Sequence, residues 1–257
     1  MEYFVPPGSV VRTIWGKADT ILFIFAGAAA EFAVNKAVDW LYFTGRLPAD
    51  PLGRLFSTVE YARQIVFAEQ HAAERAIDTI VAIHAGVEAQ RGQRIPAWAY
   101  RDVLFMLIDY SIRAYEALER PLTAAEKQEV VAVFGRVGQR MGIPEVPLTY
   151  GPWHAARQQH LRQDLAPSRY TTDLYRQYRR HLGPVRYRLL RAAQGLIVPP
   201  LVRQLLRLGS GWEIRRLLPL YHRTQHLGPS RWAREALLPT AYKAQIQALD
   251  VVPAVAA

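Results

Sequence analysis

Three residues in the first third of the chain have types and spacings that could hold a cofactor. Arg54 and Thr58 are four residues apart, so in a helix they lie on one face. His84 recurs at helical spacing with the apolar residues around it, and we predict that it points into the core. A buried imidazole on a helix that faces an apolar cavity is a common ligand of haem iron. Arg54 would then suit a haem propionate, because a guanidinium pairs with carboxylates, and Thr58 could hydrogen-bond within the pocket.

The same residues also fit a purely structural interpretation. A histidine is stable in a core when it is hydrogen-bonded, with no metal involved. In that case Arg54 makes an ordinary ion pair, and the Thr58 hydroxyl bonds to a carbonyl of its own helix. The residue pattern alone leaves both interpretations of His84 open.

The segments that must position these residues are predicted to be helices. Apolar residues recur with a period of 3.6 along most of the chain, and Gly or Pro marks the breaks. Asp50 before Pro51 is typical of a helix start, and Thr123 with Glu126 forms a capping box. We expect about ten helices, among them residues 18–43, 51–68, 72–90, 96–118, 124–141, 212–227 and 230–248. The prediction is an all-α fold in one domain over residues 1–257, with its core at about 15–240, a basic C-terminal helical extension and a tail at 241–257.

The composition is that of a folded protein. The chain has 257 residues, of which 51% are hydrophobic and 21% are charged, and this excludes intrinsic disorder. The absence of cysteine excludes disulfides and thiolate metal sites. The longest apolar stretch, residues 21–30, is shorter than the roughly 20 residues that a membrane-spanning helix needs. We therefore expect a buried helix there rather than a signal peptide, and a cytoplasmic protein.

The basic charge is confined to the C-terminal part of the chain. Residues 1–150 carry 15 Lys and Arg against 17 Asp and Glu, whereas residues 151–257 carry 17 against 5. Within this part, residues 185–207 alternate cationic and apolar side chains at helical spacing, which favours peripheral contact with an anionic membrane. The alternative places the apolar side in the core and the arginines in water. Nucleic acid is a further anionic partner, which the pattern favours less.

Other motifs carry little chemistry. His222 and His226 have a spacing that can bind a metal ion, but no third ligand accompanies them. The sequence has no phosphate-binding glycine pattern and no nucleophile elbow around a serine. Hydrolases and nucleotide-dependent enzymes are therefore not expected.

The chain resembles the rubber oxygenase (latex-clearing protein) and MpaB-type oxygenase catalytic domain family. The likeness rests on the order and spacing of short motifs between about Trp15 and Pro239, including an arginine and a threonine four apart and then an Ile/Val-x-x-x-His-x-x-Val helix. These motifs lie at residues 50–58, 66–68, 72–73, 80–87, 120–126, 141–144 and 199–203. Two positions depart from the family pattern: residues 35–36 are Asn-Lys where many relatives have His-Pro, and Ser57 stands where a latex-clearing enzyme can have an iron-capping lysine.

The resemblance implies a haem b oxygenase. Members of this family use dioxygen to cleave carbon–carbon double bonds of isoprenoid chains, so the expected partners are dioxygen and a hydrophobic, unsaturated substrate. His84 is implied as the proximal iron ligand and Arg54 and Thr58 as pocket residues. An acid or base would come from Asp39 or Glu31, whose alternative is a solvent-facing charge. The competing functions are a haem electron carrier or sensor, and a non-enzymatic helical protein that binds membranes or nucleic acid.

Overall fold

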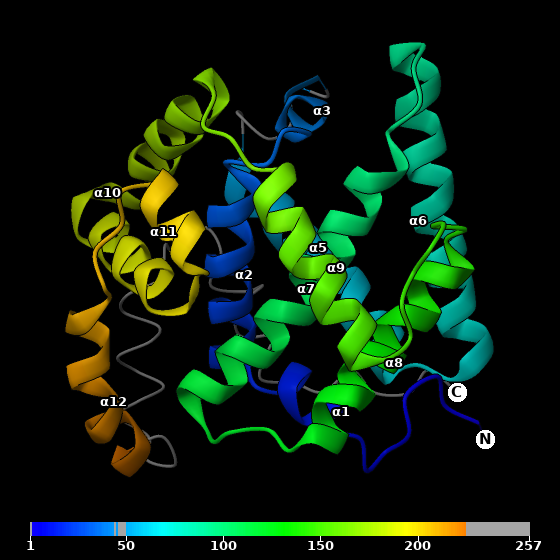
Figure 1. Cartoon of the computed structure of the whole chain (residues 1–257), viewed down its shortest axis with the longest axis horizontal. Coiled ribbons are helices and arrows are strands. Elements are labelled where there is room, and N and C mark those ends of the chain that lie inside the picture. Colours follow the sequence, from blue (N-terminus) through cyan, green and yellow to red (C-terminus); the bar gives the residue numbers. More distant parts are fainter. Residues whose placement is uncertain (1, 44, 46–49, 225–257) are drawn as a thin grey trace.

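A computed structural model describes residues 2–43, 45 and 50–224, with the backbone alone at 51, 52, 54, 55 and 224. These residues form eleven α-helices and no strand (Figure 1), which confirms the predicted all-α class. The helices are α1 (Val10–Trp15), α2 (Ala18–Phe32), α3 (Val38–Phe43), α5 (Pro51–Phe67), α6 (Gln70–Arg91), α7 (Ala97–Leu118), α8 (Ala124–Arg140), α9 (Tyr150–Gln163), α10 (Arg169–Ile197), α11 (Pro200–Leu205) and α12 (Trp212–Thr224).

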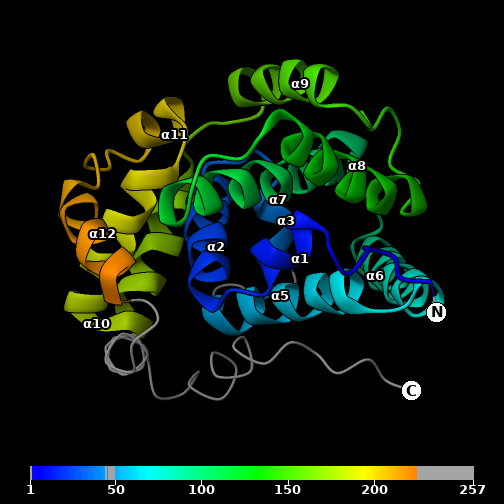
Figure 2. The same cartoon turned by 90° about the horizontal axis from the view of Figure 1, so that it is seen from below.

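Helices α2 and α7 form the centre of the molecule. Most of the inward side chains of α7 are buried, and α2 packs along it over much of its length. The close approach depends on Gly27, because a Cβ atom there would overlap the ring of Tyr110. Figure 2 shows α8 and α9 over one side of this pair and α5 over the other. One large hydrophobic core therefore unites helices from most of the described chain.

Two predicted helix starts are confirmed by their caps. The Asp50 side chain accepts a hydrogen bond from the backbone N–H of Gly53 at 2.8 Å at the start of α5. At the start of α8, Thr123 and Glu126 each bond to the other's backbone N–H, as a capping box requires.

The single helix predicted over residues 18–43 is wrong. Helix α2 ends at Phe32, α3 begins at Val38, and an irregular turn separates them. The turn is held from elsewhere in the chain: the backbone N–H of Lys36 donates to the carbonyl of Asp164 at 2.9 Å, and that of Ala166 donates to Val34 at 2.7 Å. The long-range backbone bonds replace helical ones, which no local pattern predicts.

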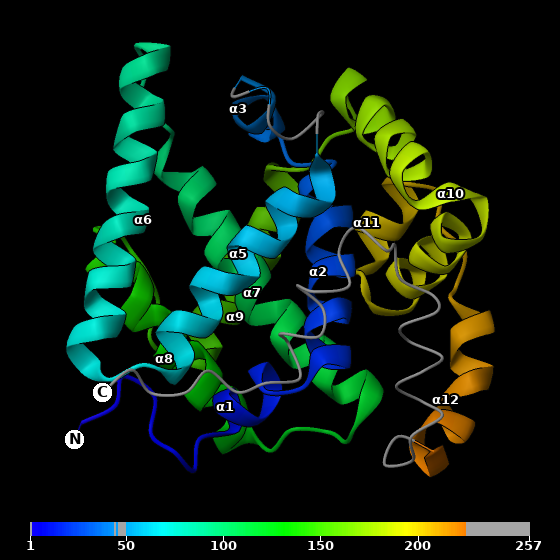
Figure 3. The ribbon, with the colours of Figure 1, turned by 180° about the vertical axis from the view of Figure 1, so that it is seen from behind.

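Helices α5 and α6 form a hairpin that diverges from its turn (Figure 3). The first half of α6 packs on α5 and α8, and its second half extends beyond the core. Gly92 ends α6 in the left-handed conformation with φ of 67°, where its own N–H and that of Gln93 bond back to Ala89 and Glu88. Such a cap suits glycine, which has no Cβ atom to clash at positive φ.

The basic C-terminal helices pack on the opposite side of the molecule from α6 (Figure 1). Helix α10 bends at Gly183, which has a φ of 74° and directly precedes Pro184. A small second hydrophobic cluster, which includes Ala33, Leu174 and Tyr178, joins α10 to the end of α2. Among the described helices none is long and apolar enough to cross a membrane. The predicted helix at 230–248 and the predicted tail at 241–257 lie outside the described residues.

Candidate functional site

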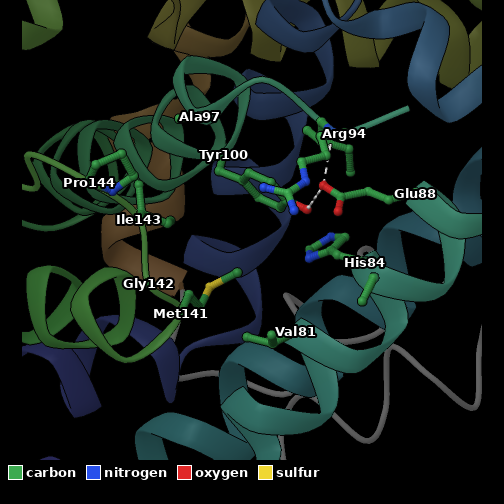
Figure 4. A pocket seen from close by; sticks show the side chains of 12 residues that line it. Val81, His84, Glu88, Arg94, Ala97, Tyr100, Met141, Gly142, Ile143 and Pro144 are labelled. Atoms are coloured by element: carbon green, nitrogen blue, oxygen red, sulfur yellow. Dashed lines mark hydrogen bonds between the residues drawn. The ribbon is translucent and has the colours of Figure 1, made fainter. Parts of the chain in front are cut away.

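His84 lies in a surface pocket rather than in the core (Figure 4). The pocket is enclosed by α6, the start of α7 and residues 141–144, and is open to solvent. The prediction that His84 points into the core is therefore wrong, since its side chain is only half-buried. The reason is that α6 runs past the end of the core: Ile77 is fully buried, but Val81 and Ile83 are 37% and 42% exposed.

The lining of this pocket combines apolar and polar side chains. Its volume of about 320 Å³ is at the lower end of the range for small-molecule sites. The apolar lining residues are Val81, Ala85, Ile95, Ala97, Met141, Ile143 and Pro144, and the polar side chains are those of His84, Glu88, Arg94 and Tyr100.

Glu88 ties the two sides of the pocket together. It lies one turn after His84 on α6 and accepts hydrogen bonds from the backbone N–H of Ile95 at 2.8 Å and from the hydroxyl of Tyr100 at 3.1 Å. The Tyr100 ring meets the imidazole edge-on, with 5.1 Å between the centroids. Burial and the bond to Glu88 raise the pKa of Tyr100 well above its ordinary value, so the phenol stays a hydrogen-bond donor at neutral pH.

The predicted pair Arg54 and Thr58 lies on α5. Thr58 is half-buried and is not among the side chains that line the pocket of His84. For Arg54 the structure describes the backbone alone, within the first turns of the helix. The described side chains therefore do not bring Thr58 and His84 into one cavity.

Asp39 makes an ion pair between α3 and the end of α6. Its carboxylate accepts a hydrogen bond from Arg91 at 2.7 Å, and the guanidinium of Arg91 stacks on the Trp40 ring at 3.9 Å. The Asp39 side chain is 35% exposed, so it is a partly buried ion-pair residue rather than a freely solvated charge. It does not line the pocket of His84, although Arg91 lies two turns after His84 on the same helix.

Glu31, the other predicted acid or base, is fully buried in an ionic cluster that the sequence did not reveal. Arg157 donates to both of its carboxylate oxygens, at 2.5 and 2.6 Å, and the Tyr110 hydroxyl donates to it at 2.8 Å. Arg157 also donates to Asp109 through Nε at 3.0 Å and Nη2 at 2.9 Å. This half of the cluster is a well-paired buried salt bridge, which excludes Glu31 from solvent.

His160 forms the other half of the cluster. Its Nε2 lies 3.1 Å from Glu31, and its Nδ1 lies 2.5 Å from Asp102 and 3.3 Å from Asp164. The amide of Asn35 donates to the second oxygen of Asp102 at 3.1 Å. The two halves together form a buried ionic cluster of Glu31, Asp102, Asp109, Arg157, His160 and Asp164.

Charge pairing controls protonation in this cluster. Burial alone would raise the pKa of Glu31, but the charge and hydrogen bonds of Arg157 outweigh it and hold this pKa at about 2. Burial alone would lower the pKa of His160, but its bonds to Asp102 and Glu31 raise it to about 9. Burial dominates at Asp102 and raises its pKa despite the neighbouring histidine. Glu31 is therefore ionised at every ordinary pH.

A sequence signal for the cluster did exist. Asp102 and Asp109 are seven residues apart on the largely buried side of α7, and Arg157, His160 and Asp164 follow at helical spacing on α9 and its C-cap. Charges on an apolar face are expected to find partners across the core. The identity of those partners depends on how α2, α7 and α9 pack together, and the spacing of residues in the sequence does not predict this packing.

The weaker metal candidate on α12 has gained no support. His222 is exposed, and His226 lies outside the described residues.

The described fold and site define an all-helical protein with a histidine pocket on one flank and a charged cluster in its centre. A family model described as ER-bound oxygenase mpaB/B'/rubber oxygenase, catalytic domain, matches residues 14–228, so the chain belongs to this family. It is thus an oxygenase catalytic domain, a kind of oxidoreductase, and the resemblance seen in the sequence is confirmed. No curated protein and no solved structure gives a significant match to the chain.

Proposed function

We propose that this oxygenase domain binds haem b through His84 and uses dioxygen to oxidise a hydrophobic, unsaturated substrate of the isoprenoid kind. The observation that carries the proposal is the direction of the His84 side chain, which faces a pocket with apolar walls from three segments of the chain (Figure 4). Membership of an oxygenase family supports the use of dioxygen.

The side chains described around His84 fit a haem group. The Nδ1 atom of His84 is shielded from solvent. Val81, Met141 and Ile143 offer apolar contacts to a flat ring, and the exposed Arg94 at the rim can pair with a propionate. Because the pocket is open, a ring larger than its enclosed volume can extend outward.

The roles of the other predicted residues rest on the family resemblance. Bound haem would supply the redox chemistry of dioxygen, and His84 would hold its iron. On the family resemblance we assign Arg54 to a propionate and Thr58 to a hydrogen bond with the bound group, because Thr58 does not line the pocket of His84. Asp39 is the candidate acid or base; its Oδ2 accepts a hydrogen bond from Arg91 at 2.7 Å, and its Oδ1 would be the oxygen that takes a proton from a substrate.

The first test is the visible spectrum of protein expressed with ample haem supply, oxidised and then reduced with dithionite. We expect a Soret band, reduced α and β bands and about one haem per chain. His84→Ala should abolish haem retention, while the control His71→Ala, on the exposed start of the same helix, should leave it unchanged.

Two outcomes would contradict the proposal. A colourless protein that does not take up added hemin removes haem, and a His84→Ala variant with full haem content and the same spectrum removes His84 as the ligand. Oxygen consumption on addition of a polyene separates an oxygenase from a haem electron carrier or sensor, which consumes none in response to it.

One observation favours a second role, contact with a membrane surface. It favours α12 as the contacting helix rather than the predicted region 185–207. In the predicted region 185–207, Ile197, Val198 and Val202 are buried, so much of its apolar side packs in the core. The strongly exposed apolar side chains of α12 are Trp212, Leu217 and Leu220, at 51%, 54% and 60%.

Exposed cations flank those apolar residues on α12. Arg215, Arg216 and Arg223 are all exposed, and Val185 on α10 is 68% exposed. Exposed apolar residues beside arginines are typical of a helix that lies in a membrane interface. We propose peripheral contact with an anionic membrane in the cytoplasm, where a lipid-soluble substrate would be available.

Sedimentation with vesicles tests this contact. We expect binding to anionic but not to zwitterionic vesicles, weakened by salt and reduced in Leu217→Ser/Leu220→Ser relative to the control Val103→Ser on α7, another exposed apolar side chain. Failure to bind anionic vesicles at low salt contradicts the proposal, and so does binding to duplex DNA in place of vesicles.

A further inference from the structure

Three potential ligand atoms converge where α7, the end of α9 and the turn after α2 meet. They are Nδ1 of His160, Oδ1 of Asp102 and Oδ2 of Asp164. All three residues place a donor atom within 4.8 Å of the others. The side chains of His160 and Asp102 are 3% and 2% exposed, whereas that of Asp164 is 23% exposed. The group is thus reachable from solvent on the side of Asp164 alone.

In this convergence one nitrogen of His160 faces two carboxylates. Both oxygens of Glu31 accept hydrogen bonds from Arg157. The imidazole nitrogen that faces Glu31 is Nε2, and it therefore carries a proton. In a protonated imidazole, the single Nδ1–H is shared between Asp102 and Asp164. A cation between the three atoms satisfies all of them at once.

The formal charge of the cluster also calls for a cation. The buried ionic cluster has four carboxylates, and the guanidinium groups beside them are that of Arg157 and that of Arg113, which pairs with Asp109 at 2.7 Å. With His160 as the imidazolium, the balance is one negative charge in a region that is largely buried, and such a net charge is costly. The nearby Lys36 is exposed, and its Nζ donates to the carbonyl of Gln163. A divalent cation that takes the place of the imidazolium proton on Nδ1 would bring the balance to zero.

The residues behind the three ligand atoms hold them as the second layer of a metal site does. Metal-bound histidines usually donate their other N–H to a carboxylate, and here Glu31 takes that position. Asp102 is oriented by the amide of Asn35, whose own Oδ1 accepts from the backbone N–H of Ala37 at 2.7 Å. By contrast, the half of the cluster around Arg157 has its partners and needs no ion.

We propose that His160, Asp102 and Asp164 bind a divalent transition-metal ion, separate from the haem iron proposed at His84. One imidazole and two carboxylates suit Mn²⁺, Fe²⁺ or Zn²⁺ better than the all-oxygen ions Mg²⁺ and Ca²⁺. The ion would join α7 to the end of α9, and the partial exposure of Asp164 provides an entry path and room for water ligands. None of the three residues lines the pocket of His84.

Titration of the full-length, chelator-treated protein with Mn²⁺ tests the site, because the electron paramagnetic resonance signal of free Mn²⁺ is lost on binding. We expect one Mn²⁺ per chain, and Asp164→Asn and His160→Gln should each weaken binding by roughly tenfold or more. The matched control is Asp173→Asn on α10, a partly exposed aspartate that bonds to Tyr42 outside the cluster; it should bind Mn²⁺ as the wild type does.

The outcome at this site is independent of the outcome at His84. The His84→Ala protein should still bind Mn²⁺, whatever its haem content. If His160→Gln does not fold by circular dichroism, Asp164→Asn decides the test, since its side chain is at the edge of the cluster. The proposal is overturned if the wild type leaves the free Mn²⁺ signal unchanged at millimolar ion, or if the folded variants bind as tightly as the wild type.

Discussion

The flank that carries His84 and the centre that carries Arg157 treat charge in opposite ways. Around His84 the polar side chains are partly exposed, and one side of the pocket is open to solvent. In the ion pair of Arg157 with Glu31 the two side chains are 1% and 0% exposed, and the guanidinium of Arg157 makes four hydrogen bonds. The comparison teaches that burial and full pairing belong here to the stability of the fold, whereas the family motif lies where a ligand can enter.

Removal of Arg157 should separate the two regions most strongly. Arg157→Met leaves Glu31 and Asp109 buried without their partner, which is expected to cost about 3–5 kcal/mol of the free energy of unfolding. The same measurement on His84→Ala, a half-buried residue, should show a loss of about 1 kcal/mol or less. Denaturant unfolding followed by circular dichroism measures both.

Arg113→Met is the matched control, because Arg113 bonds to the same Asp109 but is 34% exposed. We expect a loss of about 0–1 kcal/mol for this exposed pair. If Arg157→Met and Arg113→Met unfold at the same denaturant concentration, the buried ion pairs of Arg157 do not contribute more to the free energy of unfolding than the exposed pair of Arg113.

The next effect concerns the packing that encloses the cluster. Gly27→Ala would push the ring of Tyr110 away from its position over α2 and disturb its hydrogen bond to Glu31. Overpacking of this kind is expected to cost about 1–3 kcal/mol. Thermal unfolding of Gly27→Ala and of Gly86→Ala provides the measurement.

Gly86 offers the contrast on the flank, since a Cβ atom there meets nothing within 4 Å. Because glycine is unfavourable within a helix, Gly86→Ala should stabilise the protein by about 0.5–1 kcal/mol. Equal melting temperatures for the two variants would contradict the close approach of α2 and α7.

A further predicted effect is a dependence on acid pH. The pKa of Glu31 is about 2 in the folded protein and near its ordinary 4.5 when unfolded, so the ionised form stabilises the fold. This contribution is present above about pH 4.5 and is lost as the pH falls toward 2. The difference in unfolding free energy between wild type and Glu31→Gln should therefore shrink over that range. A difference that stays constant from pH 5 to pH 2.5 would show that the charge of Glu31 contributes nothing.

Local signals predicted much of the fold. The caps at Asp50 and Thr123 are formed by side chains within three residues of their partners, so the sequence contains all that they need. The break between α2 and α3 was missed because backbone bonds from residues 164 and 166 create it. The helical period of the sequence continues through Asn35, but backbone hydrogen bonds with the distant residues 164 and 166 break the helix there.

The site was predictable to a smaller extent. The motif around His84 indicated the correct family. The apolar stripe of its helix also predicted that His84 lies in the core, but the core ends near Ile77, two turns before His84. The partners of Glu31 were missed because Arg157 and His160 are more than 120 residues away in the chain. Ion pairs across a core depend on how helices are stacked, which periodicity does not report.

The connection between α6 and α7 has one further consequence. Gly92 turns the chain with two backbone bonds, and the carboxylate of Glu88 then fastens the backbone of Ile95 and the hydroxyl of Tyr100 to the same helix end. The separation between His84 and Tyr100 is therefore fixed before any ligand arrives. A ligand that enters this preorganised site loses little free energy to the ordering of its walls, so its affinity reports the quality of its contacts.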